Sequence, residues 1–282
     1  MARSMVTTAR PGPARGTLQR RVALLVGALP RYYITILTAL AVLLAWEVLV
    51  RALAVPRFLM PSPSLIWAAL TRFGAILLND TWITLSETVL GFVAGSAMGV
   101  LLAILIVFSR VLERMLYPPA IITQMVPKLA IAPLFVIWFG IGLPPKIMVI
   151  LIVCLFPVMI NTVAGMRSVD PRMLELMYSV NASRWQVFRK IEFPTSLPYL
   201  FAGLKIAITM AVTGAVVAEW LGSNAGLGHQ ILMANSQLST DLLFASLVML
   251  SLTGMGLFGV VAILEAVLAP RQRQINVLER VS

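Results

Sequence analysis

Long apolar runs separated by short polar stretches dominate the pattern of this chain. Runs with few or no charged residues lie at about 34–53, 88–108, 119–141, 147–166, 197–221 and 242–264. Each can cross about 30 Å of hydrocarbon, where a helix satisfies every backbone polar group within its own segment. The pattern predicts an all-α polytopic membrane protein with about six transmembrane helices.

Two of these runs contain residues that are unusual inside a membrane helix. Pro127, Lys128 and Pro133 interrupt the third run, and Lys205 lies in the fifth. Proline removes a backbone hydrogen-bond donor, and a lysine ammonium at that depth needs a partner or water. We therefore expect these two spans to be kinked or partly interfacial.

The second run carries Gly91, Gly95 and Gly99 at intervals of four residues. Small residues at this spacing share one face of a helix and let the backbone of another helix approach closely. The pattern predicts tight helix packing, and packing explains it better than a gate does.

Composition supports the membrane assignment, and the distribution of cations gives an orientation. The 282 residues are 60% hydrophobic and 12% charged, with a mean hydropathy of +0.94. Most of the 22 Lys and Arg lie in the first 31 residues, in 109–118, in 167–194 and after 265. Cytoplasmic segments retain such cations, so both termini and the 167–194 loop are predicted to be cytoplasmic.

The N-terminal segment is strongly basic. Its first 31 residues include six Arg and no acidic residue, and the apolar stretch VALLVGAL at 22–29 is too short to span a bilayer. We interpret residues 1–31 as a basic cytoplasmic tail and residues 32–282 as the membrane domain. Because the cations flank spans, the net charge of +11 gives no reason to expect a nucleic-acid partner.

The usual parts of catalytic and metal sites are missing from the sequence. No Gly is followed by Lys, so there is no phosphate-binding loop of an ATPase. One His and one Cys cannot form a zinc site, and neither G-x-S-x-G nor H-E-x-x-H occurs. We expect no enzyme, no bound cofactor and no metal, and any ATP must bind to another subunit.

The cytoplasmic loop at 167–194 shows signals for two short helices. Asp170 followed by Pro171 is typical of a helix start, and Asn181 is a plausible left-handed stop. Ser183 with Gln186 forms the pattern of a capping box that opens a second helix, which Pro194 is expected to end. Such amphipathic helices either rest on lipid headgroups or dock a cytoplasmic partner.

The same loop resembles the EAA loop of ABC-importer permeases, whose pattern is E-A-A, three residues, G, nine residues, I-x-L-P. Glu175, Asn181, Ile191 and Pro194 fall at the matching spacings. The departures from the pattern are Leu176 and Met177 for the two alanines, Asn181 for the glycine and Phe193 for the leucine. Asn for Gly is the mildest of these, because Asn tolerates the left-handed conformation.

The resemblance extends over roughly residues 40–265. PSPS at 61–64, VPKLAIAPLFVIWFGIGLPPK at 126–146, FPVMINTVAGMRSVDP at 156–171 and LPYLFAGLKIA at 197–207 are similar to nitrate/sulfonate/taurine-type permeases. AEWLGSNAGLGHQILMANSQLST at 218–240 looks most like the branch for thiamine-pyrimidine precursors or riboflavin. This resemblance implies the MetI-like fold of type I ABC permeases, with an extra N-terminal helix.

The resemblance also implies a function. The chain would be the inner-membrane permease subunit of an ATP-driven importer for a small solute, either a sulfonate- or nitrate-type anion or a heteroaromatic such as a pyrimidine or riboflavin. Its partners would be an ABC ATPase, an extracytoplasmic solute-binding protein and a second copy of the chain. The residues expected to couple to the ATPase are Glu175, Asn181, Ala182, Ser183, Arg184, Trp185, Phe188, Ile191 and Pro194.

Two intramembrane residues are candidates for the solute pathway. Lys128 either contacts the pathway or extends to the cytoplasmic surface. Glu219 precedes the Gly-rich stretch LGSNAGLGH, which we expect to face the pathway entrance, whereas Glu87 is expected to be interfacial. A self-powered secondary transporter and a membrane-embedded enzyme are the alternatives, although the acids cluster toward the predicted span ends rather than the midplane.

Overall fold

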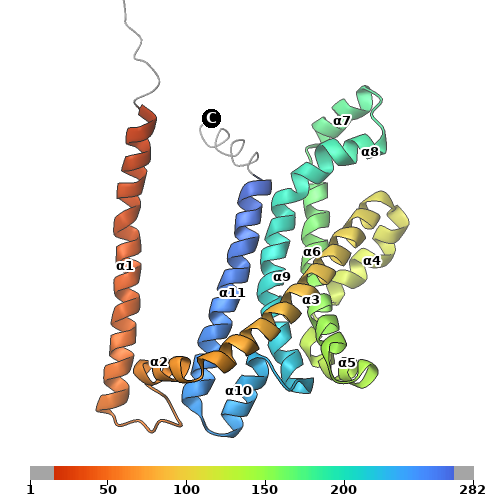
Figure 1. The fold of residues 1–282 in the computed structure, drawn as a ribbon. Helices are drawn as coiled ribbons and strands as arrows, with labels where there is room; N and C mark the ends of the chain where they lie inside the picture. The colour runs from red at the N-terminus through yellow and green to blue at the C-terminus, as the bar shows by residue number, and fades with distance from the viewer. Residues whose placement is uncertain (1–15, 270–282) are drawn as a thin grey trace, which may run out of the picture. The chain divides into compact units, whose positions relative to one another are not determined.

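The computed structural model describes the backbone of residues 16–269 and the side chains of residues 33–269, and within them it contains helices and no strands (Figure 1). The α-helices are α1 (Gly16–Ala52), α2 (Pro63–Arg72), α3 (Gly74–Phe108), α4 (Arg110–Ile122), α5 (Ala132–Phe139), α6 (Leu143–Arg167), α7 (Pro171–Ser179), α8 (Arg184–Val187), α9 (Phe193–Gly222), α10 (Leu227–Ser236) and α11 (Thr240–Leu268). A 3₁₀ helix, η1 (Lys128–Ile131), and a π-helix, η2 (Phe188–Glu192), complete the described elements.

Five segments are long and apolar enough to cross a membrane. They are Tyr33–Ala52, Gly74–Phe108, Leu143–Arg167, Arg184–Gly222 and Thr240–Leu268. Five of the six predicted spans lie within these segments, which confirms an all-α, multi-pass membrane protein. The second span begins at Gly74, well before its predicted start, and the polar residues of its first half, Asp80, Thr84 and Glu87, are bonded to other segments of the bundle.

The third predicted span is wrong as a continuous helix. It is divided into α4, η1 and α5, with Pro118 and Pro119 inside α4, Pro127 at the cap of η1 and Pro133 in the first turn of α5. α4 continues through Pro118 and Pro119, and the run breaks between Ile122 and Lys128, where Pro127 lacks the N–H that would continue the hydrogen-bond ladder. The segment still connects the end of α3 to the opposite end of the bundle, where α6 begins (Figure 1).

The fifth span also departs from the expected pattern, because Pro194 does not end the second loop helix. Instead, α8, η2 and α9 form one continuous helical segment, Arg184–Gly222. The N–H of Phe193 donates to the carbonyl of Phe188, five residues back, so the helix widens by a π turn just before Pro194. Pro194 then lies in the first turn of α9, where a missing N–H is tolerated.

The chain divides into two units, residues up to Ser64 and residues from Leu65. In the first unit, Glu47 accepts hydrogen bonds from the backbone N–H of Ser64 at 3.0 Å and from its hydroxyl at 2.8 Å. Residues 1–15 of the predicted basic tail lie outside the described residues, and α1 already includes the remainder of that tail from Gly16.

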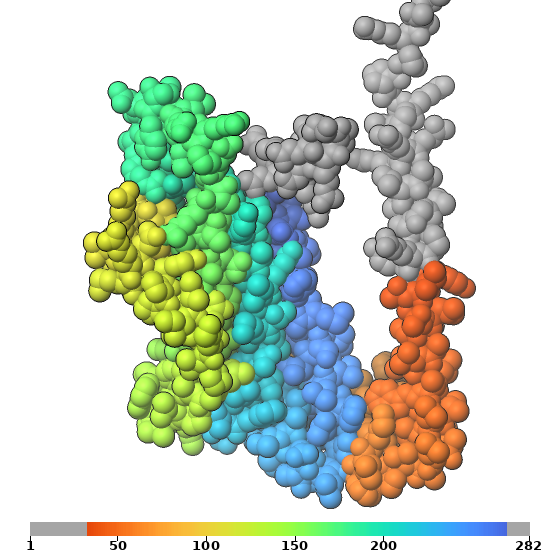
Figure 2. Space-filling model, turned by 180° about the vertical axis from the view of Figure 1, so that it is seen from behind, coloured from red at the N-terminus to blue at the C-terminus, as the bar shows by residue number. Residues whose placement is uncertain are grey.

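The core of the second unit lies where α6 packs against α3 and α9. Side chains on α6 and α9 form it, including Ile150, Cys154, Val158, Phe201, Ile208 and Ala211. A Cβ on Gly95 would lie 2.5 Å from the carbonyl oxygen of Leu151, and one on Gly99 would lie 2.7 Å from that of Leu155. The predicted close approach along the glycine face is therefore confirmed. Figure 2 shows α7 and α8 at one end of this unit and α10 at the other.

Candidate functional site

The loop between α6 and α9 folds as a helical hairpin. Asp170 caps α7 by accepting a hydrogen bond from the N–H of Arg172 at 2.9 Å. Asn181 has a φ of 57°, which confirms the predicted left-handed reversal. The N–H of Ala182 then donates to the carbonyl of Met177 at 3.0 Å, a bond that closes the end of α7.

The second helix of the hairpin starts at the predicted capping box. The N–H of Gln186 donates to Ser183 Oγ at 3.3 Å, and the N–H of Ser183 donates to Gln186 Oε1 at 2.8 Å. These reciprocal bonds satisfy two amides that the helix itself leaves unpaired. Local sequence signals therefore fix both the end of α7 and the start of α8.

The hairpin separates its residues into an outer and an inner set. Its exposed apolar side chains are Met173, Leu176, Tyr178, Val180 and Trp185. Of the predicted coupling residues, those on the exposed side are Glu175, Asn181, Ser183, Trp185 and Pro194. Phe188 and Ile191 are buried, and Ala182 and Arg184 are half-buried. The exposed side offers an apolar surface outside the helix bundle.

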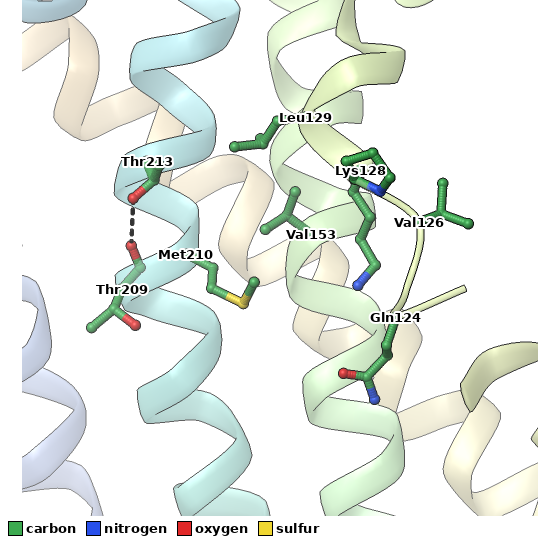
Figure 3. Close-up of a pocket in the computed structure, with 9 residues that line it drawn as sticks. Gln124, Val126, Lys128, Leu129, Val153, Thr209, Met210 and Thr213 are labelled. Carbon is green, nitrogen blue, oxygen red and sulfur yellow. Dashed lines mark hydrogen bonds between the residues drawn. The ribbon is translucent and has the colours of Figure 1, made fainter. Parts of the chain in front are cut away.

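A cavity of about 490 Å³ lies between the interrupted segment and α9 (Figure 3). It is lined by Gln124, Val126, Pro127, Lys128, Leu129, Val153, Thr209, Met210 and Thr213. Lys128 and Gln124 lie on one side, and the α9 residues Thr209, Met210 and Thr213 lie on the other (Figure 3). The break at Pro127 thus brings polar side chains to a place where a continuous helix would present an apolar surface.

Lys128 lines this cavity, and its ammonium has no carboxylate partner among the described residues. The ammonium lies 5.3 Å from the centroid of the Phe156 ring. A cation in this position favours negative or electron-rich groups nearby.

The sequence analysis did not identify Thr209 and Thr213 of α9 as site residues. Their spacing of four residues places both hydroxyls on one face of an otherwise apolar helix, and this pattern could have indicated a polar lining.

Glu219 does not line the cavity. It is fully buried, and its oxygens accept hydrogen bonds from Thr84 Oγ1 at 2.7 Å and from the N–H of Gly228 at 2.5 Å. Asp80 accepts from the N–H of Gly226 at 3.1 Å. The N–H groups of Gly226 and Gly228, at the start of α10, have no partner within the helix, so Asp80 and Glu219 satisfy them and hold this end of α10.

Glu87, which the sequence placed near the outer end of its span, has a partner on another helix. It is buried, and Lys146 Nζ lies 2.6 Å from its Oε1 and 2.7 Å from Ser223 Oγ. Sequence reasoning missed this pair, because its members come from different helices. Among the described residues, no three His, Cys, Asp or Glu side chains lie close enough together to hold a metal ion.

Comparison with known proteins gives relatives of one kind. Residues 91–274 match the family described as binding-protein-dependent transport system inner membrane component. The riboflavin transport system permease protein RibX of Chloroflexus aurantiacus is 34% identical, over 82% of this chain and 87% of RibX. The formylaminopyrimidine transport permease protein ThiX of Halalkalibacterium halodurans is 32% identical, over 83% of this chain and 94% of ThiX. The taurine transport system permease protein TauC of Escherichia coli is 31% identical, over 84% of this chain and 86% of TauC.

The fold is also similar to solved transporter structures. A chain of the MetNI methionine ABC transporter in an inward-facing conformation superimposes with a TM-score of 0.59, at 18% identity, over 70% of this chain and 98% of that chain. This likeness supports the MetI-type permease fold. The comparisons support an ABC importer permease for small solutes and lend no support to a self-powered secondary transporter. The chain belongs to the family of binding-protein-dependent transport system inner membrane components.

Proposed function

We propose that this chain is half of an ATP-driven importer, in which two copies form the pathway and separate ATPase subunits bind the α7–α8 hairpins. An extracytoplasmic binding protein delivers the solute, and the hairpins and both termini are cytoplasmic. The main support for this proposal is the hairpin, in which Leu176 is 65% exposed and Trp185 is 58% exposed outside the helix bundle. Apolar side chains in such a cluster favour a protein groove as their partner.

The proposal of a second copy rests on the open side of the cavity. Thr209, Met210 and Thr213 are exposed on α9, so one chain leaves this wall of the cavity uncovered. A two-fold partner presenting the same surface would enclose a shared pathway between the two cavities. ATP would bind only to the ATPase subunits, because the chain has no phosphate-binding loop.

The solute is proposed to pass the cavity and to contact Lys128. The lining offers an ammonium, an amide and two hydroxyls among apolar side chains. Such a lining suits a small solute with acceptor oxygens, whether a sulfonate or a heteroaromatic vitamin precursor with carbonyl groups. Glu219 has no proposed contact with the solute, because its oxygens are already bonded to α10 and Thr84.

Purification of the tagged chain in mild detergent from its own host tests the proposal. We expect an ABC ATPase to copurify and ATP hydrolysis to respond to the loaded binding protein. The variant Leu176→Asp places a charge on the exposed side of α7 and should lose the ATPase, whereas Leu176→Met keeps an apolar side chain and should retain it. Solute accumulation by the chain alone, driven by an ion gradient, would contradict the proposal.

A further inference from the structure

Arg184, the first residue of α8, faces the bundle rather than the proposed ATPase surface. Its Nη1 lies 2.6 Å from Glu192 Oε1, and its Nη2 donates to the carbonyl oxygen of Val107 at 3.3 Å. Its guanidinium lies 5.1 Å from the centroid of the Phe108 ring. The side chain therefore contacts the end of α3, which is separated from it by more than seventy residues of sequence.

The carbonyl that Arg184 reaches belongs to the last turn of α3. Carbonyls in a last turn have no partner within their own helix and carry the negative end of the helix dipole. A planar guanidinium can contact this carbonyl, a carboxylate and a ring at once, which a lysine ammonium cannot do. Arg184 thus joins the hairpin to α3 through two contacts, with the Val107 carbonyl and the Phe108 ring. Its ion pair with Glu192 fixes the guanidinium within its own helical segment.

An aromatic cluster reinforces the same joint. The Phe108 ring packs edge-on against Phe188 with centroids 5.1 Å apart, and Trp185 stacks on Phe188 at 5.3 Å. Trp185 also lies 6.3 Å from Phe108. The first turns of α8 and η2 therefore hold the end of α3 from several directions, and the hairpin cannot move far without α3.

On the side toward α9, the joint contains an irregular helical turn. The π turn Phe188–Glu192 separates α8 from α9, and Oε2 of the buried Glu192 has no hydrogen-bond partner among the described residues. Single π turns inside α-helices recur at functional sites. The segment is thus held to α3 on one side and continues into α9 through an irregular turn on the other.

Movement of α3 would reach the cavity through its neighbours. α3 packs backbone to backbone on α6 along its glycine face, so we expect a movement of α3 to carry α6 with it. α4 follows α3 directly through Ser109, which accepts a hydrogen bond from the N–H of Leu112 at 3.3 Å. α4 in turn leads to Gln124, the first residue that lines the cavity.

We infer that Arg184 is a positioning residue that links the ATPase-facing hairpin to α3, so that hairpin movement shifts α3 and α4 and reshapes the cavity. This inference rests on the proposed function, since the movement would come from the ATPase. Trp185 and the exposed face of α7 contact the ATPase, whereas Arg184 acts behind them, on the permease itself.

The labelling rate of a cysteine at position 124 can show whether the cavity changes shape, and this test does not require the solute to be known. In Gln124→Cys the reporter lies on the cavity, while the native Cys154 is fully buried and should stay unlabelled. The rate of labelling with a water-soluble maleimide is measured in two states of the chain–ATPase complex, one free of nucleotide and one trapped with vanadate. We expect the two rates to differ by about fivefold or more in the wild-type background.

A set of variants then distinguishes three possible roles of Arg184: transmitting hairpin movement to α3, binding the ATPase, and stabilising the fold. In Arg184→Gln the rate difference should fall below about twofold while the ATPase still copurifies. The double variant Arg184→Gln/Glu192→Gln should behave in the same way without leaving a buried carboxylate unpaired. Phe108→Leu, which lies outside the hairpin, should weaken the response in the same direction. Arg189→Gln removes an equal charge from an exposed position of the same segment and should keep the full response.

Each remaining outcome overturns the inference or its basis. A full nucleotide response in Arg184→Gln, or no response in the wild type, would show that the link does not reach the cavity. Loss of the ATPase from the Arg184→Gln complex would assign the residue to docking instead. Absence of any ATPase from the wild-type preparation would contradict the proposed function itself, and is therefore distinguishable from failure of the inference.

Discussion

Lys146 Nζ lies 2.6 Å from Glu87 Oε1, and both side chains are buried between α6 and α3. Ser223 Oγ, just past the end of α9, accepts a second hydrogen bond from Lys146 at 2.7 Å. One ammonium near the start of α6 thus joins the middle part of α3 to the end of α9. Burial makes both charges costly to leave alone, so the pair behaves as a unit.

Removing one member of this pair should destabilise the protein strongly. In Lys146→Met the Glu87 carboxylate stays buried without a counter-charge, and we expect a loss of about 3–5 kcal/mol. The double variant Lys146→Met/Glu87→Gln has no unpaired charge and should recover most of this loss. Thermal unfolding of the detergent-solubilised protein measures both, and equal stability of the single and double variants would contradict the coupling.

The contact between Glu219 and α10 predicts a second effect on stability. A Cβ on Gly228 would lie 2.8 Å from Glu219 Oε2 and 2.9 Å from Val216 Cα. Gly228→Ala should therefore displace α10 and cost about 1–3 kcal/mol. Gly256→Ala is the matched control, because a Cβ there meets nothing within 4 Å and the change should raise helix stability slightly. Similar unfolding temperatures for the two variants would show that α10 is not held in this way.

Local signals in the sequence predicted the hairpin in detail, whereas the tertiary pairs were out of reach. Asp170, Asn181 and Ser183 act on backbone groups within a few residues, so their geometry could be derived from spacing alone. The pair of Glu87 and Lys146 joins residues 59 apart, and no local rule selects such partners. Pro194 was misjudged because the preceding π turn, which accommodates it, has no recognised local signature.

The reversal at Asn181 predicts a difference between two substitutions there. Its φ of 57° suits Asn or Gly, while a β-branched residue is strained in this region by about 1–2 kcal/mol. Asn181→Gly should be tolerated, and Asn181→Val should shift α8 and weaken ATPase copurification while the membrane level stays normal. If Val behaves like the wild type and Gly is defective, the angle of the hairpin is set elsewhere.

The distribution of cations predicts the orientation of the bundle. α9 leads from the hairpin to the opposite end, so residues near Asn224 should lie on the other side of the membrane from the hairpin (Figure 1). A reporter fused after Ser282 should be cytoplasmic, and one inserted beside Asn224 should be external. Activity of both reporters on the same side would contradict the alternation of spans, including the broken third one.

The cavity around Lys128 should select reagents by charge. A cysteine in Thr213→Cys lies across the cavity from the Lys128 ammonium, and its reaction with an anionic sulfonate-bearing methanethiosulfonate can be compared with that of a cationic ammonium-bearing one. Because the ammonium attracts anions and repels cations, the anionic-to-cationic rate ratio should be several-fold higher than for a free thiol.

Lys128→Gln should bring this ratio down by about fivefold, whereas Lys205→Gln serves as a matched control that also removes one intramembrane cation. Lys205 is ion-paired with Glu265 and is absent from the cavity lining, so its loss should leave the ratio nearly unchanged. Equal ratios in the wild type and in Lys128→Gln would show that the ammonium does not act on the cavity. In that case Lys128 would serve the interrupted segment through its contact with Phe156 rather than a passing solute.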